Sequence, residues 1–309
     1  MEKLILVPSN LGLNPLYEGH IPGTFRAPSV LMNHGLDKTF SGCEIATVTC
    51  PEYSHEEEQG TDILNGHKLR FLNLQLAEEV GTALRCNLKP VVIGVDCAIL
   101  PGVLLGCRHY SGPVALVHID GHSDFRHPEN WKRGPGSRPG AAAGMDLALV
   151  TGRGEALLTE WPGIERPLVS DAAVIQLGER ELFLEDYEWP DIGDTDILRI
   201  SIFDALALSD TELTDMIFGR LDAFTEIPYW IHLDLDVLDG TEMAAVDCLG
   251  TPGLSSQRLE NICRTLFRHT HCCGISVTIF DPDLDPEGTS ARLVSRIISN
   301  ITGRSRCST

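Results

Sequence analysis

Short runs of apolar residues alternate along the chain with longer stretches in which apolar residues recur at helical spacing. The short runs are rich in β-branched residues and nearly continuous, as in strands that are covered on both faces. They predict strands at residues 4–7, 91–94, 114–119, 173–177, 229–233 and 275–279. The helical spacing predicts helices at residues 69–84, 147–158, 209–224, 255–268 and 289–299. Either Asp210 or Ser255 would serve as a helix N-cap.

This alternation of strands and helices predicts an α/β fold with a single doubly wound, mostly parallel sheet and helices on both of its faces. No internal repeat, low-complexity tract or linker interrupts the pattern, so we expect one domain over residues 1–309. In sheets of this kind, ligands bind outside the carboxyl ends of the strands. The residues that follow each predicted strand are therefore the candidates for chemistry.

The composition is that of a globular protein with a strongly acidic balance. The 309 residues include 24 Lys and Arg against 44 Asp and Glu, a net charge of −20, which disfavours a nucleic-acid or anionic-membrane partner. The first apolar run is too short for a signal peptide or a membrane span, and every later run is cut by a charge, Gly or Pro. The ten cysteines show no C-x-x-C pair, so we expect reduced thiols and a cytoplasmic protein.

Acidic and metal-binding side chains follow four of the predicted strands. They are Asp96 and Cys97 after the strand at 91–94, Asp120, His122 and Asp124 after 114–119, Asp234, Asp236 and Asp239 after 229–233, and Asp281 and Asp283 after 275–279. In an extended chain, positions i, i+2 and i+4 point to one side, so D-x-H-x-D at 120–124 sets two carboxylates beside an imidazole. D-x-D at 234–236 adds two more carboxylates at the same edge.

Carboxylates that converge in this way repel one another strongly unless cations lie between them. Carboxylate-rich ligation with an imidazole fits Mn²⁺, and two ions about 3.5–4 Å apart would share carboxylates and lower the pKa of a water between them. An Asp at a strand end often caps a turn instead, and one D-x-D motif alone is weak evidence. The two motifs together favour a metal site.

The motifs and their order resemble those of the arginase/agmatinase family, the ureohydrolases. The pieces that carry the resemblance are G-x-D-C at 94–97, D-G-H-S-D-F at 120–125, H-L-D-L-D-V-L-D at 232–239, G-T-P at 250–252 and D-P at 281–282. The resemblance implies an arginase-like fold with two Mn²⁺ ions per subunit. It also implies a hydrolase that cleaves a non-peptide C–N bond of a linear guanidino or amidino compound and releases urea, or a substituted urea, and an amine.

The resemblance assigns the metal ligands residue by residue. Asp120, His122, Asp124, Asp234 and Asp236 match all but one of the family's ligands. We expect activity to depend directly on Asp124 and Asp234. The resemblance also suggests a small-molecule substrate and a homo-oligomer, either a trimer or a hexamer.

Cys97 stands where the family has the His of G-G-D-H-S. A thiolate ligates metals but is softer than imidazole, so it shifts the preference towards Zn²⁺ or Fe or weakens Mn²⁺ at that position. The same exchange, together with the run at 145–154, resembles a subgroup of the family that includes hydroxyarginine amidinohydrolase. The alternative is that Cys97 is a buried apolar residue beside a one-metal site.

Further departures from the family pattern concern the substrate. Ala143 aligns with the family's proton-shuttling His and Ile279 with its guanidinium-binding Glu, so standard recognition of arginine or agmatine is in doubt. Arg126 lies where the family contacts the carboxylate end of the substrate, and Asp281 is a candidate for binding a substrate cation. Their alternative roles are charge balance for Arg126 and a turn cap for Asp281. His127 is a candidate replacement for the proton shuttle.

Two other classes of function remain open from the sequence. A single-zinc amide hydrolase like the deacetylases shares this fold and a similar Asp-x-His and Asp ligand set, but one metal does not need both aspartate motifs. A non-catalytic binding or assembly protein would explain the missing His and Glu, but metal ligands without a metal cost stability. The number of metal ions per chain, near two, one or none, separates the three classes.

Overall fold

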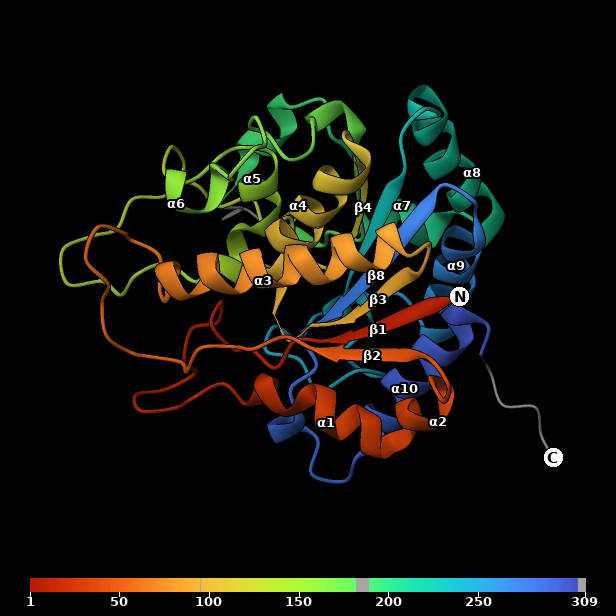
Figure 1. Cartoon of the computed structure of the whole chain (residues 1–309), viewed down its shortest axis with the longest axis horizontal. Helices are drawn as coiled ribbons and strands as arrows, with labels where there is room; N and C mark the ends of the chain where they lie inside the picture. The colour runs from red at the N-terminus through yellow and green to blue at the C-terminus, as the bar shows by residue number, and fades with distance from the viewer. Residues whose placement is uncertain (95, 182–188, 305–309) are drawn as a thin grey trace.

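The computed structural model describes residues 1–94, 96–181 and 189–304 (Figure 1). Within these residues, eight strands form one sheet in the order β2-β1-β3-β8-β7-β4-β5-β6, and the neighbouring strands are parallel. The strands are β1 (Glu2–Leu6), β2 (Glu44–Thr47), β3 (Lys89–Ile93), β4 (Ala115–Ile119), β5 (Val174–Leu177), β6 (Leu198–Ile200), β7 (Tyr229–Asp234) and β8 (Cys272–Thr278). Val95 and Cys307 lie outside the described residues.

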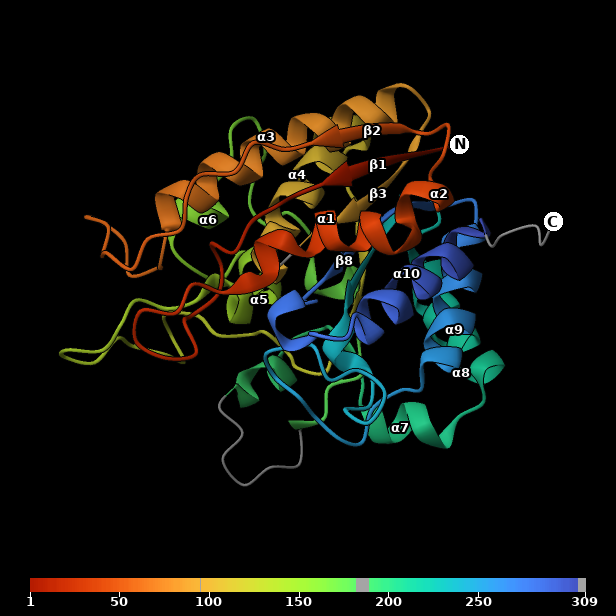
Figure 2. The ribbon, with the colours of Figure 1, turned by 90° about the horizontal axis from the view of Figure 1, so that it is seen from below.

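Helices cover both faces of this sheet, as Figure 1 and Figure 2 show from two directions. One face carries α3 (Gly66–Arg85), α4 (Leu100–Ser111), α5 (Asp146–Val150) and α6 (Ala156–Thr159). The other carries α1 (Ala27–Leu31), α2 (Asp37–Thr39), α8 (Asp210–Leu221), α9 (Ser256–Arg268) and α10 (Thr289–Thr302), and α7 (Ile202–Ala207) follows the edge strand β6. The arrangement confirms the predicted doubly wound α/β class. In the described part of the chain, no helix has the length and hydropathy that a bilayer crossing requires.

The predicted strands are all present, with ends shifted by a few residues. The structure adds β2 and β6 at the two edges of the sheet. The hydrophobic pattern missed them because their side chains are mostly exposed or half-buried and form no apolar run. It also missed α4, because the first two turns of this helix are buried all round and lack the polar face that marks an amphipathic helix.

The single helix predicted at 147–158 is wrong, because α5 and α6 replace it. Gly152 and Gly154 lie between them with φ of 86° and 144°, in the region that glycine favours and that ends a right-handed helix. The short helix α5 begins at Asp146, whose side chain is fully buried.

The two expected N-caps had different outcomes. Ser255 caps α9, since its side chain accepts a hydrogen bond from the backbone N of Arg258. Asp210 does not cap α8, because Ser209 takes that position. Ser209 and Glu212 form a capping box in which each side chain accepts a hydrogen bond from the other's backbone N.

The strands that precede the metal-binding motifs are neighbours at the centre of the sheet, in the order β3-β8-β7-β4. The carboxyl ends of these strands lie in register: Ile93 pairs with Val277, Val277 with Leu233, and Leu233 with Ile119. The motifs that follow these strands therefore begin side by side at the carboxyl ends of the strands, as the sequence predicts.

Helix α3 holds the chain that follows β3. The side chain of Asn73 in α3 accepts a hydrogen bond from the backbone N of Gly102 at 2.6 Å and donates one to the carbonyl of Ala98 at 3.0 Å. Ala98 lies in the 3₁₀ turn Cys97–Ile99, so this contact fixes the turn that carries Cys97. A Cβ on Gly102 would lie 2.6 Å from Asn73 Oδ1 and 2.8 Å from its carbonyl oxygen.

Replacing Gly102 by Ala should lower the free energy of unfolding by about 2 kcal/mol, because α4 must move away from α3. Gly219→Ala in α8 is the matched control, since no described atom lies within 4 Å of a Cβ there, and it should stabilise the protein by about 1 kcal/mol. Urea denaturation of both variants measures the difference. An unchanged unfolding midpoint for Gly102→Ala would show that the α3–α4 contact has room for a methyl group.

Candidate metal centre

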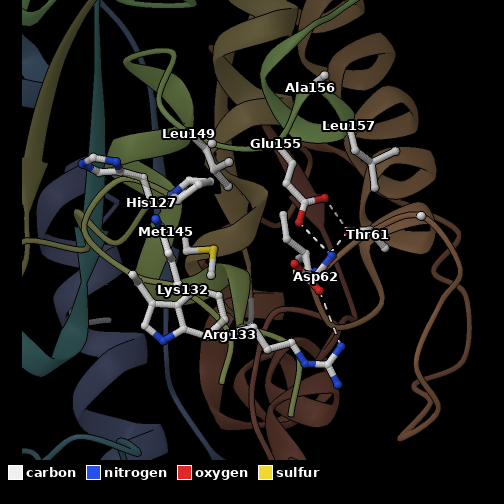
Figure 3. Close-up of a pocket in the computed structure, with 15 residues that line it drawn as sticks. Thr61, Asp62, His127, Lys132, Arg133, Met145, Leu149, Glu155, Ala156 and Leu157 are labelled. Atoms are coloured by element: carbon white, nitrogen blue, oxygen red, sulfur yellow. Dashed lines mark hydrogen bonds and ion pairs between the residues drawn. The ribbon is translucent and has the colours of Figure 1, made fainter. Parts of the chain in front are cut away.

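A cavity of about 820 Å³ opens beside α5 and α6 (Figure 3). His127, Met145 and Glu155 are among its lining residues, whereas none of the strand-end aspartates is among those described. The Nε2 atom of His127 lies 2.7 Å from Asp191 Oδ2. Because His127 faces this cavity and is paired with Asp191, the structure does not bring the predicted replacement proton shuttle to the strand ends.

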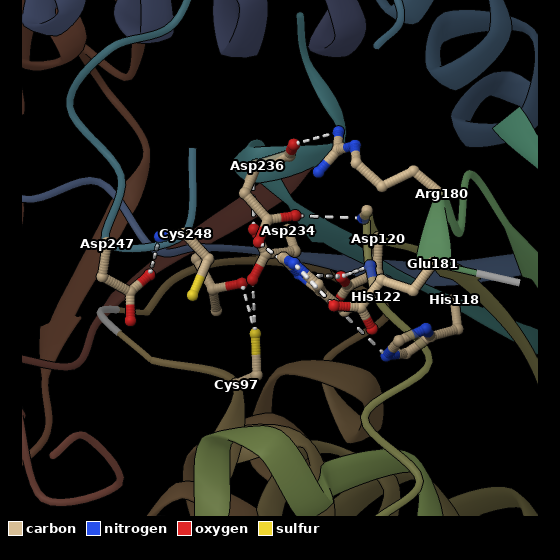
Figure 4. A network of polar contacts seen from close by, with 12 residues as sticks. Cys97, His118, Asp120, His122, Arg180, Glu181, Asp234, Asp236, Asp247 and Cys248 are labelled. Carbon is tan, nitrogen blue, oxygen red and sulfur yellow. Dashed lines mark hydrogen bonds and ion pairs between the residues drawn. The ribbon is translucent and has the colours of Figure 1, made fainter. Parts of the chain in front are cut away.

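Separate from this cavity, a cluster of acidic and metal-binding side chains lies at the carboxyl ends of the central strands (Figure 4). Cys97 begins the turn after β3 and is 1% exposed. Its Sγ lies 2.8 Å from Oδ2 of Asp234 and 3.2 Å from Oγ1 of Thr278, the last residues of β7 and β8. The thiol therefore faces the D-x-D motif and not a purely apolar neighbourhood.

His122 joins the D-x-H-x-D motif to the D-x-D motif. Its Nδ1 lies 2.8 Å from Asp236 Oδ2 and 3.6 Å from Asp120 Oδ1. The first aspartate of each motif also stabilises the bend after its strand. Asp120 Oδ1 accepts a hydrogen bond from the backbone N of His122, and Asp234 Oδ1 accepts one from the backbone N of Asp236, both at 2.7 Å. Asp120 and Asp234 thus cap turns and also take part in the converging set of carboxylates.

Two overlapping groups of ligand atoms lie close enough together to hold cations. Cys97, Asp120 and Asp234 form one group, and Asp120, His122 and Asp236 form the other; within each group the ligand atoms lie within 4.8 Å of one another. We call these the outer groups. Asp120 belongs to both, and its Oδ2 has no hydrogen-bond partner among the described residues. Carboxylates with an imidazole and a thiol are donors that Mn²⁺, Fe²⁺ and Zn²⁺ accept, so the residues fit a dinuclear centre.

Asp124 lies beside the outer groups without belonging to either. Its backbone is left-handed, with φ of 46°, and its carbonyl accepts a hydrogen bond from the N of Ala148 at 3.3 Å. It lines the same cavity as Cys97 and Asp234. Its location is therefore consistent with the predicted ligand role, although its carboxylate lies outside the two groups.

Burial and crowding shift the pKa values throughout this cluster. Burial raises the pKa of Asp124 and Asp234 well above the ordinary range, and neighbouring carboxylates raise it further. Burial, with Asp234 nearby, also raises the pKa of the Cys97 thiol. Burial opposes protonation of His122, but the charges and hydrogen bonds of Asp236 and Asp120 together outweigh it and raise the pKa of this imidazole. An environment that penalises ionised carboxylates so strongly is stabilised by a cation.

The family model described as Arginase family matches residues 19–303 of the chain. The chain belongs to the arginase family. This match confirms the resemblance inferred from the motifs. The arginase of Brevibacillus brevis is 24% identical over 75% of this chain and 74% of its own length, and the formimidoylglutamase of Klebsiella pneumoniae is 23% identical over 78% and 69%. The structure of arginase from Bacillus caldovelox covers 97% of both chains with a TM-score of 0.83 at 22% identity, which confirms the arginase-like fold.

The cavity at the strand ends of this arginase-family chain has a volume of about 240 Å³. Arg126, Ala143 and Ile279 are among the residues that line it. The guanidinium carbon of Arg126 lies 5.2 Å from the ring centre of Trp131 and 5.9 Å from that of Trp189. The predicted substrate residue Arg126 thus lines the cavity, supported by two aromatic rings.

Asp281 is not among the described residues that line this cavity. Its carboxylate is 3% exposed, and Oδ1 accepts a hydrogen bond from the backbone N of Asp283 at 2.9 Å. It therefore caps the turn Pro282–Leu284, as one of the two alternatives expected. The structure gives no geometric support to the predicted contact between Asp281 and a substrate cation.

Arg180 is a further member of the site. Its Nη2 donates a hydrogen bond to the carbonyl of Asp236 at 2.7 Å and its Nε donates to that of Pro252 at 3.2 Å. Burial alone would raise the pKa of Asp236, but the charge and hydrogen bond of His122, the charge of Arg180 and the hydrogen bond from the Gly121 backbone together outweigh it and lower that pKa. A Cβ at Gly121 would collide with the Arg180 guanidinium, so a larger residue at this position would displace that side chain. The contact joins separate loops, so no spacing in the sequence marks it.

Metal-free protein should lose stability as the pH rises, because its buried carboxyls resist ionisation. Burial raises the pKa of Asp124 and Asp234, at the outer groups, well above the ordinary value of 3.8. In the metal-free protein the folded state therefore holds protons that the unfolded state releases, and the free energy of unfolding falls as the pH rises above that ordinary value. A bound cation takes the place of those protons.

We expect the gap in Tm between Mn²⁺-loaded and chelated protein to widen by at least about 2 °C from about pH 5 to about pH 7.5. Thermal unfolding followed by circular dichroism measures both states at each pH. A gap that stays constant across this range would contradict cation binding to the carboxylate cluster.

Proposed function

We propose that the protein is a metal-dependent hydrolase of a linear amidine or guanidino compound, releasing urea or a substituted urea and an amine. The observation that carries the proposal is the pair of outer groups, which share Asp120 at the central strand ends of an arginase-family chain. The cavity beside them, of about 240 Å³, suits a small linear molecule.

The outer groups would hold two divalent cations in this proposal. Mn²⁺ suits the group of Asp120, His122 and Asp236, whereas the thiol of Cys97 in the other group favours Zn²⁺ or Fe. Cations bound in this way lower the pKa of a water and polarise the group under attack. Asp124, which faces the cavity, is suited to orient that water and to receive its proton.

The residues on the substrate side of the cavity favour a substrate with a carboxylate at one end and a weakly charged group at the other. The Arg126 guanidinium is suited to bind a carboxylate through two parallel hydrogen bonds. Ala143 and Ile279 leave an apolar wall where the family pattern has an acid/base His and a guanidinium-binding Glu. Such a wall penalises the full charge of arginine. An N-hydroxylated guanidine, or another weakly basic amidine, meets both requirements.

Asp234→Asn and Asp124→Asn should each lose metal and reduce kcat for the preferred amidine by at least about 100-fold, because the first removes a carboxylate of an outer group and the second removes one beside the outer groups. Elemental analysis counts the metal ions, and urea release gives the rate. Asp247→Asn is the control, since Asp247 lines the same cavity but belongs to neither outer group, and it should keep the wild-type metal content. Full metal occupancy in Asp234→Asn would show that the ligand assignment is wrong.

N-hydroxyarginine should exceed arginine and agmatine in kcat/KM by at least about 10-fold under identical metal loading, a difference of about 1.4 kcal/mol in transition-state stabilisation. Its hydroxylated guanidine is less basic, so it carries less charge to the apolar wall. Steady-state urea release from the three compounds measures the ratio. Arginine or agmatine reacting as efficiently as N-hydroxyarginine would overturn this preference and leave the hydrolase proposal intact.

Arg126→Ala, with Arg126→Lys as its conservative partner, should raise KM for N-hydroxyarginine but not for agmatine, which has no carboxylate.

A further inference from the structure

A layer of ionisable side chains lies beneath the outer groups, farther from the carboxyl ends of the central strands. His118 of β4 and His232 of β7 pair in register, and their rings stack with centres 5.3 Å apart. Asp146, at the start of α5, approaches both: its carboxylate lies 3.3 Å from His118 Nε2 and 3.4 Å from His232 Nε2. All three side chains are fully buried. The proposed hydrolase chemistry uses none of them.

Cys97 connects this layer to the outer groups. Its Sγ, a carboxylate oxygen of Asp146 and a ring nitrogen of His232 form a third group whose ligand atoms lie within 4.8 Å of one another. We call it the deep group. The same thiol also belongs to the outer group with Asp120 and Asp234. The position at which this chain departs from the family's His is therefore the position at which the two layers meet.

Polar atoms of the deep group lack hydrogen-bond partners. Among the described residues, neither Asp146 Oδ1 nor His232 Nε2 has one. His232 Nε2 lies 3.4 Å from Asp146 Oδ2, and Asp146 Oδ1 lies 3.3 Å from His118 Nε2; both distances are too long for a strong charge-assisted bond. A buried polar atom without a hydrogen-bond partner lowers the stability of the folded state. A cation between them would satisfy both atoms.

Ser276 can hold the His232 ring in the form that ligates a metal. The Nδ1 of His232 lies 2.8 Å from Ser276 Oγ, which also accepts a hydrogen bond from Trp230 Nε1 at 3.0 Å. When Nδ1 carries the proton and donates it to Ser276, the lone pair of Nε2 points to the deep group. Metal-bound histidines are oriented in this way, with the second ring nitrogen donating to a neighbouring acceptor.

We propose that Cys97, Asp146 and His232 bind a divalent cation in the layer beneath the outer groups, and that Ser276 positions His232 for it. The thiolate, carboxylate and imidazole donors select an ion of the Zn²⁺ class over Mn²⁺. The inference deepens the proposed function, on which it rests for the identity of the outer metal centre. The deep cation anchors Cys97 and offsets the charge of Asp146.

Zinc content tests the proposal through two ligand variants and one matched control. Asp146→Asn and His232→Gln should each lose about one equivalent of tightly bound zinc after reconstitution with Zn²⁺ and Mn²⁺ and gel filtration. His118→Gln, in the same buried layer and stacked on His232, should keep the wild-type zinc content, since His118 is outside the deep group. Elemental analysis gives the counts, and near-ultraviolet circular dichroism establishes which variants are folded. Wild-type zinc in folded Asp146→Asn and His232→Gln would overturn the proposal.

Anomalous diffraction at the zinc edge provides a test that needs no variant. Crystals of the wild-type protein reconstituted with Zn²⁺ should show a peak between Cys97, Asp146 and His232. Peaks at the outer groups alone would overturn the deep site while leaving the proposed hydrolase intact. A deep peak in a protein that hydrolyses none of the amidines would uphold the deep site and overturn the proposed function.

Discussion

The carboxylates buried at the carboxyl ends of the central strands repel one another, and the rest of the site must offset that repulsion. Asp120 and Asp234 are at most 3% exposed, and each caps the bend that follows its own strand. The parallel register of β4 and β7 fixes their separation, so the carboxylates cannot move apart without disturbing the strand pairing. Neighbouring imidazole and guanidinium groups, those of His122 and Arg180, offset only part of the charge. A cation in each outer group, as proposed, would supply the positive charge that the described side chains lack.

The strand-end cluster was predictable because it depends on a regular feature of parallel sheets. Neighbouring parallel strands bring their carboxyl ends together, so the motifs that follow them converge. The alternation expected for D-x-H-x-D does not hold, because β4 ends at Ile119 and Asp124 has φ of 46°. The edge strands β2 and β6 and the break between α5 and α6 were not predictable from hydrophobic spacing. The edge strands have too few buried side chains, and the break depends on the backbone conformation of Gly152 and Gly154. The deep layer was missed because His118 and His232 lie within apolar strands, where a single histidine looks like a core residue.

The two sides of the cavity differ in how firmly the fold determines them. The proposed metal ligands stand on or directly after central strands, and all of them except Cys97 match the family pattern. The proposed substrate residues stand outside the strands and the longer helices: Arg126 follows the D-x-H-x-D motif, Ala143 lies in a 3₁₀ turn before α5, and Ile279 adopts φ of 71° just after β8. Loops tolerate substitution without loss of the sheet. The family therefore identifies the chemistry of this chain more closely than it identifies the substrate.

Compared with a histidine, cysteine at position 97 offers a softer ligand atom and also places that atom closer to the sheet. The sulfur is bonded directly to Cβ, whereas the ring nitrogens of a histidine lie farther out along the side chain. A thiol on the same turn therefore keeps its ligand atom closer to the sheet, where Sγ contacts the last residues of β7 and β8. At that depth the nearest additional donors are Asp146 and His232, not the groups that face the cavity. In the proposed deep site, a shorter and softer ligand at the junction of the two layers would therefore hold its cation closer to Asp146 and His232 than a ligand atom farther out on the side chain would.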